Sequence, residues 1–164
     1  GVSIINVHAS GGRQMLTEAV KAVDAVCASE HLDRPLLLAV TVLTSMDDAN
    51  LVETGVDGTA TEQVIRLARL TRDCGLDGVV ASPLEIGLIR QNVAPEPFAI
   101  LTPGIRPAGE AKGDQKRVMT PAEAVAAGAT YLVVGRPITA AADSKAAAER
   151  IAAEMEAVPG TASA

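Results

Sequence analysis

Two arginines occupy matching places in the sequence, each just after an apolar run rich in branched residues. Arg106 follows Gly104 by two positions, and Arg136 directly follows Gly135. A guanidinium group presents a planar fork of N–H donors to phosphate oxygens, and a nearby glycine lets backbone N–H groups approach a ligand. One such arginine is better explained as a surface ion pair. Two of them after neighbouring runs predict a phosphate-binding site.

Further polar residues follow other apolar runs. His8 has no potential ligand partner nearby in the sequence, so we expect a structural, hydrogen-bonded histidine. The longest irregular stretch, 102–120, has the length of a functional loop rather than of a simple connection. Lys116 and Arg117 are expected to decorate this loop, with a supporting role near a phosphate as the alternative.

The residues that precede these polar segments read as strands. Each run is continuously apolar, which is typical of strands buried on both faces. The five runs are 3–7, 35–42, 77–81, 97–101 and 130–134. Helical spacing of apolar residues predicts helices between them and after the last. These helices are 13–28, 61–74 with Thr61 as its N-cap, 84–91, 121–127, and 143–158 with Asp143 as its cap.

Alternation of strand and helix predicts an α/β fold with a parallel sheet. Both an open doubly wound sheet and part of a (β/α)8 barrel fit the order of elements. In either fold, ligands bind beyond the carboxyl ends of the strands, where the polar segments lie. No GxGxxG motif opens a helix after the first strand, which disfavours a dinucleotide site.

Composition narrows the function classes further. The 164 residues carry a net charge of −6, which disfavours a nucleic-acid binder that works through a broad basic face. No uninterrupted apolar stretch is long enough to cross a membrane, and we expect no signal peptide. Cys27 and Cys74 are isolated, so neither a disulfide framework nor a zinc site is expected. A reducing cytoplasm is the predicted location.

Six motifs, in sequence order, resemble the orotidine 5'-phosphate decarboxylase family. They are NVHASGG (6–12), AVTVLTSM (39–46), CGLDGVV (74–80), TPGIRP (102–107), GDQKR (113–117) and VGRPI (134–138). The resemblance extends from near residue 2 to about residue 155. It implies the fold of a (β/α)8 TIM barrel. It also implies the activity of a carboxy-lyase, which converts orotidine 5'-monophosphate to UMP in pyrimidine biosynthesis without a metal or organic cofactor.

The same resemblance implies roles for five residues. Arg136 and the backbone of Gly135 would hold the 5'-phosphate. Gln115 would close over the phosphate and the pyrimidine, and Arg106 would be a further ligand-binding residue. Thr44 would hydrogen-bond the pyrimidine edge.

The family's catalytic Asp-x-Lys-x-x-Asp motif does not occur in this sequence. The four lysines lie in predicted helices or in the long loop: Lys21, Lys112, Lys116 and Lys145. We therefore assign no catalytic residue, and we expect this chain to be inactive by itself. Relative to the family, its five strands correspond to strands four to eight, so the expected architecture is a partial barrel of five βα units.

The resemblance also sets expectations for organisation and partners. Residues 1–158 would form the C-terminal part of a single barrel domain, and 159–164 would be a disordered tail. The complete enzyme would be a homodimer that binds a small-molecule substrate and neither nucleic acid nor membrane. Two alternatives remain open. One is a related phosphosugar barrel, such as hexulose-phosphate synthase or keto-gulonate-phosphate decarboxylase, and the other is a non-catalytic phosphate-binding module.

Overall fold

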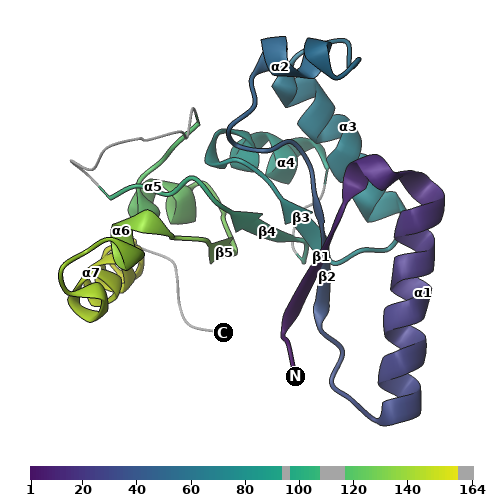
Figure 1. Cartoon of the computed structure of the whole chain (residues 1–164), viewed down its shortest axis with the longest axis horizontal. Coiled ribbons are helices and arrows are strands. Elements are labelled where there is room, and N and C mark those ends of the chain that lie inside the picture. The colour runs from purple at the N-terminus through teal and green to yellow at the C-terminus, as the bar shows by residue number, and fades with distance from the viewer. Residues whose placement is uncertain (94–96, 108–116, 159–164) are drawn as a thin grey trace.

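The computed structural model of the chain describes residues 1–93, 97–107 and 117–158. Gln115 and the expected tail at 159–164 lie outside these ranges. Five parallel strands form one sheet (Figure 1), in the order in which they occur along the chain. The strands are β1 (Ile4–His8), β2 (Leu36–Val40), β3 (Gly78–Val80), β4 (Ala99–Thr102) and β5 (Tyr131–Leu132). Each strand overlaps one of the five predicted runs.

Seven α-helices lie among the described residues, together with two 3₁₀ turns. The helices are α1 (Gly12–Glu30), α2 (Asp48–Glu53), α3 (Ala60–Asp73), α4 (Ile86–Asn92), α5 (Pro121–Ala126), α6 (Arg136–Thr139) and α7 (Ser144–Glu156). The turns are η1 (Ala9–Gly11) and η2 (Pro83–Glu85), which lead into α1 and α4. The five helices predicted from helical spacing include neither α2 nor the single turn α6.

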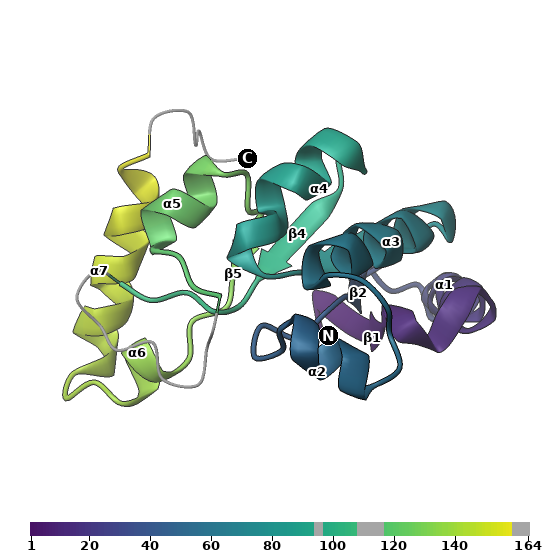
Figure 2. The ribbon, with the colours of Figure 1, turned by 90° about the horizontal axis from the view of Figure 1, so that it is seen from above.

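The strand order separates the two architectures that the sequence left open. A doubly wound sheet reverses its strand order at a switch point, whereas the strands of a (β/α)8 barrel follow one another in sequence. The observed order β1-β2-β3-β4-β5 contains no reversal. Figure 2 shows α1, α3, α4 and α5 in succession around one side of the sheet. The predicted partial barrel of five βα units is confirmed.

Side chains at the helix starts define where the helices begin. Thr59, and not the predicted Thr61, is the N-cap of α3. The Thr59 hydroxyl accepts a hydrogen bond from the Glu62 backbone N–H, and the Glu62 carboxylate accepts one from the Thr59 N–H at 2.8 Å. This reciprocal capping box places the N-cap two residues earlier than predicted. Asp143 caps α7 as predicted, by accepting from Ala146 N–H.

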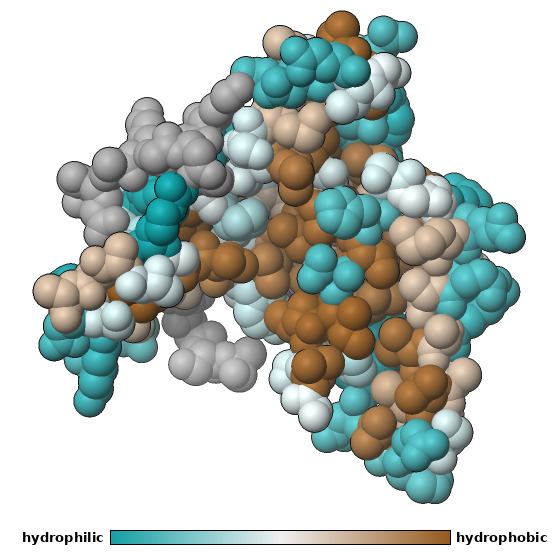
Figure 3. Space-filling view, in the orientation of Figure 1, coloured by the Kyte–Doolittle hydropathy of each residue, from teal (hydrophilic) through white to brown (hydrophobic). Residues whose placement is uncertain are grey.

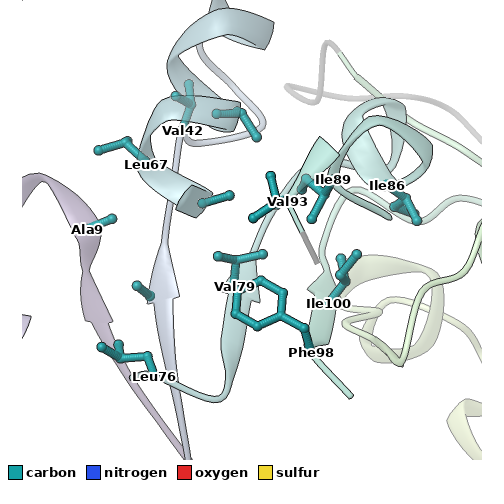
Figure 4. Packing of buried hydrophobic residues seen from close by; sticks show 14 of the residues in the cluster. Ala9, Val42, Leu67, Leu76, Val79, Ile86, Ile89, Val93, Phe98 and Ile100 are labelled. Carbon is teal, nitrogen blue, oxygen red and sulfur yellow. The ribbon is translucent and has the colours of Figure 1, made fainter. Parts of the chain in front are cut away.

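The hydrophobic core lies between the sheet and the helices α3 and α4 (Figure 4). Val79 of the central strand β3 and Ile100 of the neighbouring β4 are fully buried, as is Ile89 from α4. Phe98 is the one aromatic residue of this core, and it lies just before β4. Aliphatic side chains therefore form nearly the whole core, as the composition requires.

Arginines tie the segments together at the amino ends of the strands. Arg34 precedes β2 and bonds the carboxylates of Asp24 at 2.6 Å and Asp77 at 2.7 Å, and these bonds raise the pKa of its guanidinium group. Arg90 of α4 donates to the backbone oxygens of Phe98 at 2.6 Å and Gly128 at 3.0 Å. This edge is therefore occupied by structural contacts, as is usual for the amino face of a barrel.

Apolar side chains also reach the surface. Figure 3 shows hydrophobic residues gathered near β1 and the N-terminus. There Val2 is 66% exposed and Ile5 is 37% exposed. Among the described residues, no helix has the length and apolar character required to cross a bilayer.

Candidate functional site

The two arginines that predicted a phosphate site follow adjacent strands. β4 and β5 pair in parallel, with Thr102 opposite Leu132. Arg106 comes four residues after Thr102, and Arg136 comes four residues after Leu132. The prediction that both arginines follow neighbouring strands at the same edge of the sheet is thus confirmed by the topology.

Arg106 is a fixed part of this edge. It is 8% exposed, and its guanidinium Nη1 donates to the Ile105 carbonyl at 2.7 Å. Its backbone N–H donates to the Met119 carbonyl at 3.0 Å, beside a parallel bridge between Ile105 and Met119. The segment after β4 is therefore bound to the segment that leads into α5, and a charged side chain is held where the sequence placed a ligand contact.

Gly135 and Arg136 form the turn after β5, and both are exposed. Gly135 is the N-cap of α6, with φ −98° and ψ −103°. A Cβ added to Gly135 would meet no atom within 4 Å, so its backbone borders open space. Because α6 is a single turn, the positive charge that it offers comes from the Arg136 guanidinium itself. An anion could approach both the backbone and the side chain here.

Thr44 lies in the turn after β2, where it is 8% exposed. It borders a hollow of about 280 Å³ whose walls also include Val80, Ala81 and Pro103. The hollow joins the turn after β2 to the segments that follow β3 and β4. Thr44 and the segment that carries Arg106 therefore border one concave region at the carboxyl edge, which is the arrangement that the sequence predicts for a ligand.

Arg117 departs from its predicted place on the loop surface. It is 9% exposed, and its Nη1 lies 2.6 Å from Glu85 Oε1 in a buried ion pair. Its Nη2 donates to the Leu43 carbonyl at 3.0 Å. Sequence reasoning missed Glu85 because this carboxylate lies in an apolar helical pattern. The one indication in the sequence was the place of Glu85 among apolar residues, because a buried carboxylate requires a charged or hydrogen-bonding partner.

His8 and the lysines are the remaining candidates. His8 is exposed, and its side chain makes no hydrogen bond to the described residues. The prediction of a structural, hydrogen-bonded histidine is therefore wrong. Lys21 lies within α1 and pairs with Glu18 at 2.8 Å, and Lys145 lies near the start of α7. Lys112 and Lys116 lie outside the described ranges, as Gln115 does. No described ammonium group extends from a strand end.

Residues 1–151 match the family model described as "Orotidine 5'-phosphate decarboxylase / HUMPS family". A protein of Moorella thermoacetica named orotidine 5'-phosphate decarboxylase is 57% identical over 159 residues, which is 96% of this chain and 63% of the relative. One of the same name from Syntrophotalea carbinolica is 53% identical over 157 residues, 96% of this chain and 64% of the relative.

A solved structure agrees with these sequence matches. The crystal structure of orotidine 5'-phosphate decarboxylase from Lactobacillus acidophilus superposes with a TM-score of 0.79 at 41% identity. The match covers 96% of this chain and 65% of that one. The chain thus spans a little less than two thirds of the length of each of these three relatives.

Proposed function

The chain belongs to the orotidine 5'-phosphate decarboxylase / HUMPS family, and we propose that it supplies the phosphate- and pyrimidine-binding edge of an enzyme that converts orotidine 5'-monophosphate to UMP. In this proposal Arg136 and the backbone of Gly135 hold the 5'-phosphate. Arg106 is a further ligand-binding residue, and Thr44 hydrogen-bonds the pyrimidine. Gln115, outside the described residues, contributes a contact to both ends of the nucleotide.

One observation carries the proposal: Arg106 and Arg136 follow adjacent, paired strands of a barrel sheet at its carboxyl edge. Phosphate sites of (β/α)8 barrels are frequently built from the segments after the last two strands, and β4 and β5 are the last two strands here. Arginine suits the task because its donors match phosphate oxygens in a bidentate manner. The hollow beside Thr44 offers a place for the attached base.

The reaction requires a further group. When a carboxylate leaves, a carbanion develops that must be stabilised, and a proton must take the place of the carbon dioxide lost. The sequence holds no Asp-x-Lys-x-x-Asp motif, and no described lysine extends from a strand end. We therefore propose that this chain binds the nucleotide but does not decarboxylate it, and that the complete enzyme's remaining segment supplies the ammonium and carboxylate groups.

The proposal extends to partners and location. The complete enzyme is a homodimer of the cytoplasm that uses no metal or organic cofactor. Cys27 and Cys74 are free thiols in the structure, which fits a reducing compartment.

The family description also includes HUMPS proteins, whereas the curated relatives cited above carry the decarboxylase name. Those relatives favour the nucleotide as ligand over a sugar phosphate.

Calorimetric titration of the chain with UMP, uridine and ribulose 5-phosphate tests this function. We expect UMP to bind and uridine to bind at least tenfold more weakly, because charge-assisted bonds to phosphate contribute about 1.5–3 kcal/mol. Ribulose 5-phosphate retains the phosphate but lacks the base, so it should also bind more weakly than UMP. Equal or tighter binding of ribulose 5-phosphate would instead identify a sugar-phosphate enzyme.

A further inference from the structure

The buried pair of Arg117 and Glu85 lies where three strand-end segments meet. Glu85 ends the turn η2, which follows β3, and it is 2% exposed. Arg117 lies two residues before Met119, whose carbonyl accepts the Arg106 backbone N–H. The second guanidinium nitrogen of Arg117 reaches the Leu43 carbonyl, next to Thr44. A single side chain therefore connects the segments that follow β2, β3 and β4.

Leu43 shows how this contact acts on the candidate site. Its carbonyl also accepts the Met46 backbone N–H at 2.9 Å, which closes the turn that contains Thr44. Arg117 and this turn thus share one acceptor, so the guanidinium fixes the turn from outside. On the other side, the bond between Arg106 and Met119 joins the Arg106 segment to the same stretch of chain as Arg117.

The ion pair is not fully satisfied by hydrogen bonds among the described residues. Glu85 Oε2 and Arg117 Nε are buried and have no hydrogen-bond partner there. A buried pair of this kind is weak in its net contribution to stability, because desolvation of both charges offsets their attraction. The geometry of the pair does, however, hold the Glu85 and Leu43 segments in fixed positions relative to each other. The planar Arg117 guanidinium must bond the Glu85 carboxylate and the Leu43 carbonyl at the same time.

We infer that Arg117, held by Glu85, is a positioning residue that fixes Thr44 and Arg106 relative to each other at the ligand-binding edge. The inference rests on the proposed function for its ligand, and on the contacts above for its geometry. It assigns Arg117 no contact with substrate. Its effect passes through the Leu43 carbonyl on one side and the Met119 segment on the other.

Arg90 offers a matched control at the opposite edge of the sheet. Its guanidinium also bridges two segments, by bonding the Phe98 and Gly128 carbonyls before β4 and β5. Loss of Arg90 should therefore loosen the amino edge and leave the carboxyl edge intact. Comparison of the two arginines separates a positional effect from a general loss of packing.

The test uses the double variant Glu85→Met/Arg117→Met, because removal of one partner would leave a buried charge unpaired and endanger folding. Amide hydrogen exchange is measured by mass spectrometry on the chain, its double variant and Arg90→Met. We expect the Met46 and Arg106 amides to exchange at least tenfold faster in the double variant, while α1 is unchanged. Arg90→Met should leave both amides as in the parent chain.

Unchanged exchange at both amides, or equal acceleration throughout the chain, would overturn the inference. UMP titration provides the second measurement. We expect the dissociation constant for UMP to rise at least tenfold in the double variant and to change less than twofold in Arg90→Met. If the parent chain fails to bind UMP, the proposed function fails and hydrogen exchange still decides the positioning role. If the double variant binds UMP as tightly as the parent chain does, the inference that Arg117 positions Thr44 and Arg106 for ligand binding is wrong.

Discussion

Charged side chains at the carboxyl edge differ in what their removal would reveal. Arg106 and Arg117 are buried and bonded to backbone oxygens, so their loss disturbs structure as well as binding. Arg136 is exposed at the start of α6. Substitution of Arg136 therefore removes less buried contact than substitution of Arg106 or Arg117.

We predict that Arg136→Met raises the dissociation constant for UMP about 10- to 100-fold and leaves uridine binding unchanged. The proposed phosphate contact of Arg136 explains both expectations, because a charge-assisted hydrogen bond contributes about 1.5–3 kcal/mol and uridine has no phosphate. Isothermal titration calorimetry measures both constants. Arg66→Met is the matched control, because Arg66 is also exposed and its described contact is with Gln63 on the same helix. An equal effect of both substitutions would contradict a local phosphate contact.

The sequence predicted where the two arginines lie along the sheet better than it predicted the contacts around them. Gly-flanked arginines after apolar runs indicate phosphate chemistry from local pattern, and the topology places Arg106 and Arg136 after adjacent strands. Arg117 was misplaced because its burial depends on Glu85, which lies 32 positions away. No local pattern reports a contact of that kind, since it exists only once two separate segments have packed.

Elements were predictable where local rules decide them. Continuous apolar runs located all five strands, and an aspartate at position 143 correctly marked the start of α7. The boundary of α3 was wrong because two threonines, Thr59 and Thr61, could each cap it. The position of Glu62 decided between them, since it stands three residues after Thr59 and completes a capping box.

Strand pairing imposes a strict requirement on Gly78. A Cβ placed there would lie 2.1 Å from the carbonyl oxygen of Ala99 on the neighbouring strand. We predict that Gly78→Ala lowers the free energy of unfolding by about 2–3 kcal/mol, because the backbone must shift to relieve the overlap. Urea denaturation followed by circular dichroism measures this change.

Gly87→Ala is the control with the opposite expected sign. Gly87 lies in α4, and its added Cβ would meet no atom within 4 Å. Alanine favours a helix over glycine, so this change should stabilise the chain by about 0.5–1 kcal/mol. Destabilisation of similar size by both substitutions would show that close strand contact at Gly78 is not the cause.

Two capping boxes predict an acid-sensitive component of stability. Bonds from the Thr59 and Thr120 backbone N–H groups, and then from their hydroxyls, lower the pKa of Glu62 and Glu123. Because the folded pKa lies below the unfolded value, the contribution is complete above the unfolded pKa. It is lost as the pH falls through the folded one.

The double variant Glu62→Gln/Glu123→Gln should therefore lose less thermal stability than the parent chain between pH 7 and pH 3. Glutamine retains the capping geometry but does not titrate. Melting temperatures followed by circular dichroism at both pH values test the difference. Parallel losses in the two proteins would show that these carboxylates do not contribute to the acid response.

At the scale of the whole molecule, strand order was the property that the pattern of elements could not decide, and only the family resemblance predicted a barrel. The order of elements fitted a doubly wound sheet and a barrel equally, because both alternate strand and helix. Pairing of each strand with its sequence neighbour resolved the question. The chain covers only 63% of the length of the Moorella thermoacetica relative. This part nevertheless includes the strand ends that Thr44, Arg106 and Arg136 follow.

We propose that this chain binds the nucleotide and lacks the groups that decarboxylate it. The most direct measurement follows the absorbance of orotidine 5'-monophosphate with the chain itself and with a chimera that adds the unmatched part of the Moorella thermoacetica relative. We predict no turnover by the chain and turnover by the chimera, with kcat/KM reduced about 10- to 100-fold by Arg136→Met. Turnover by the chain alone at the rate of the chimera, or a folded chimera without activity, would contradict the claim.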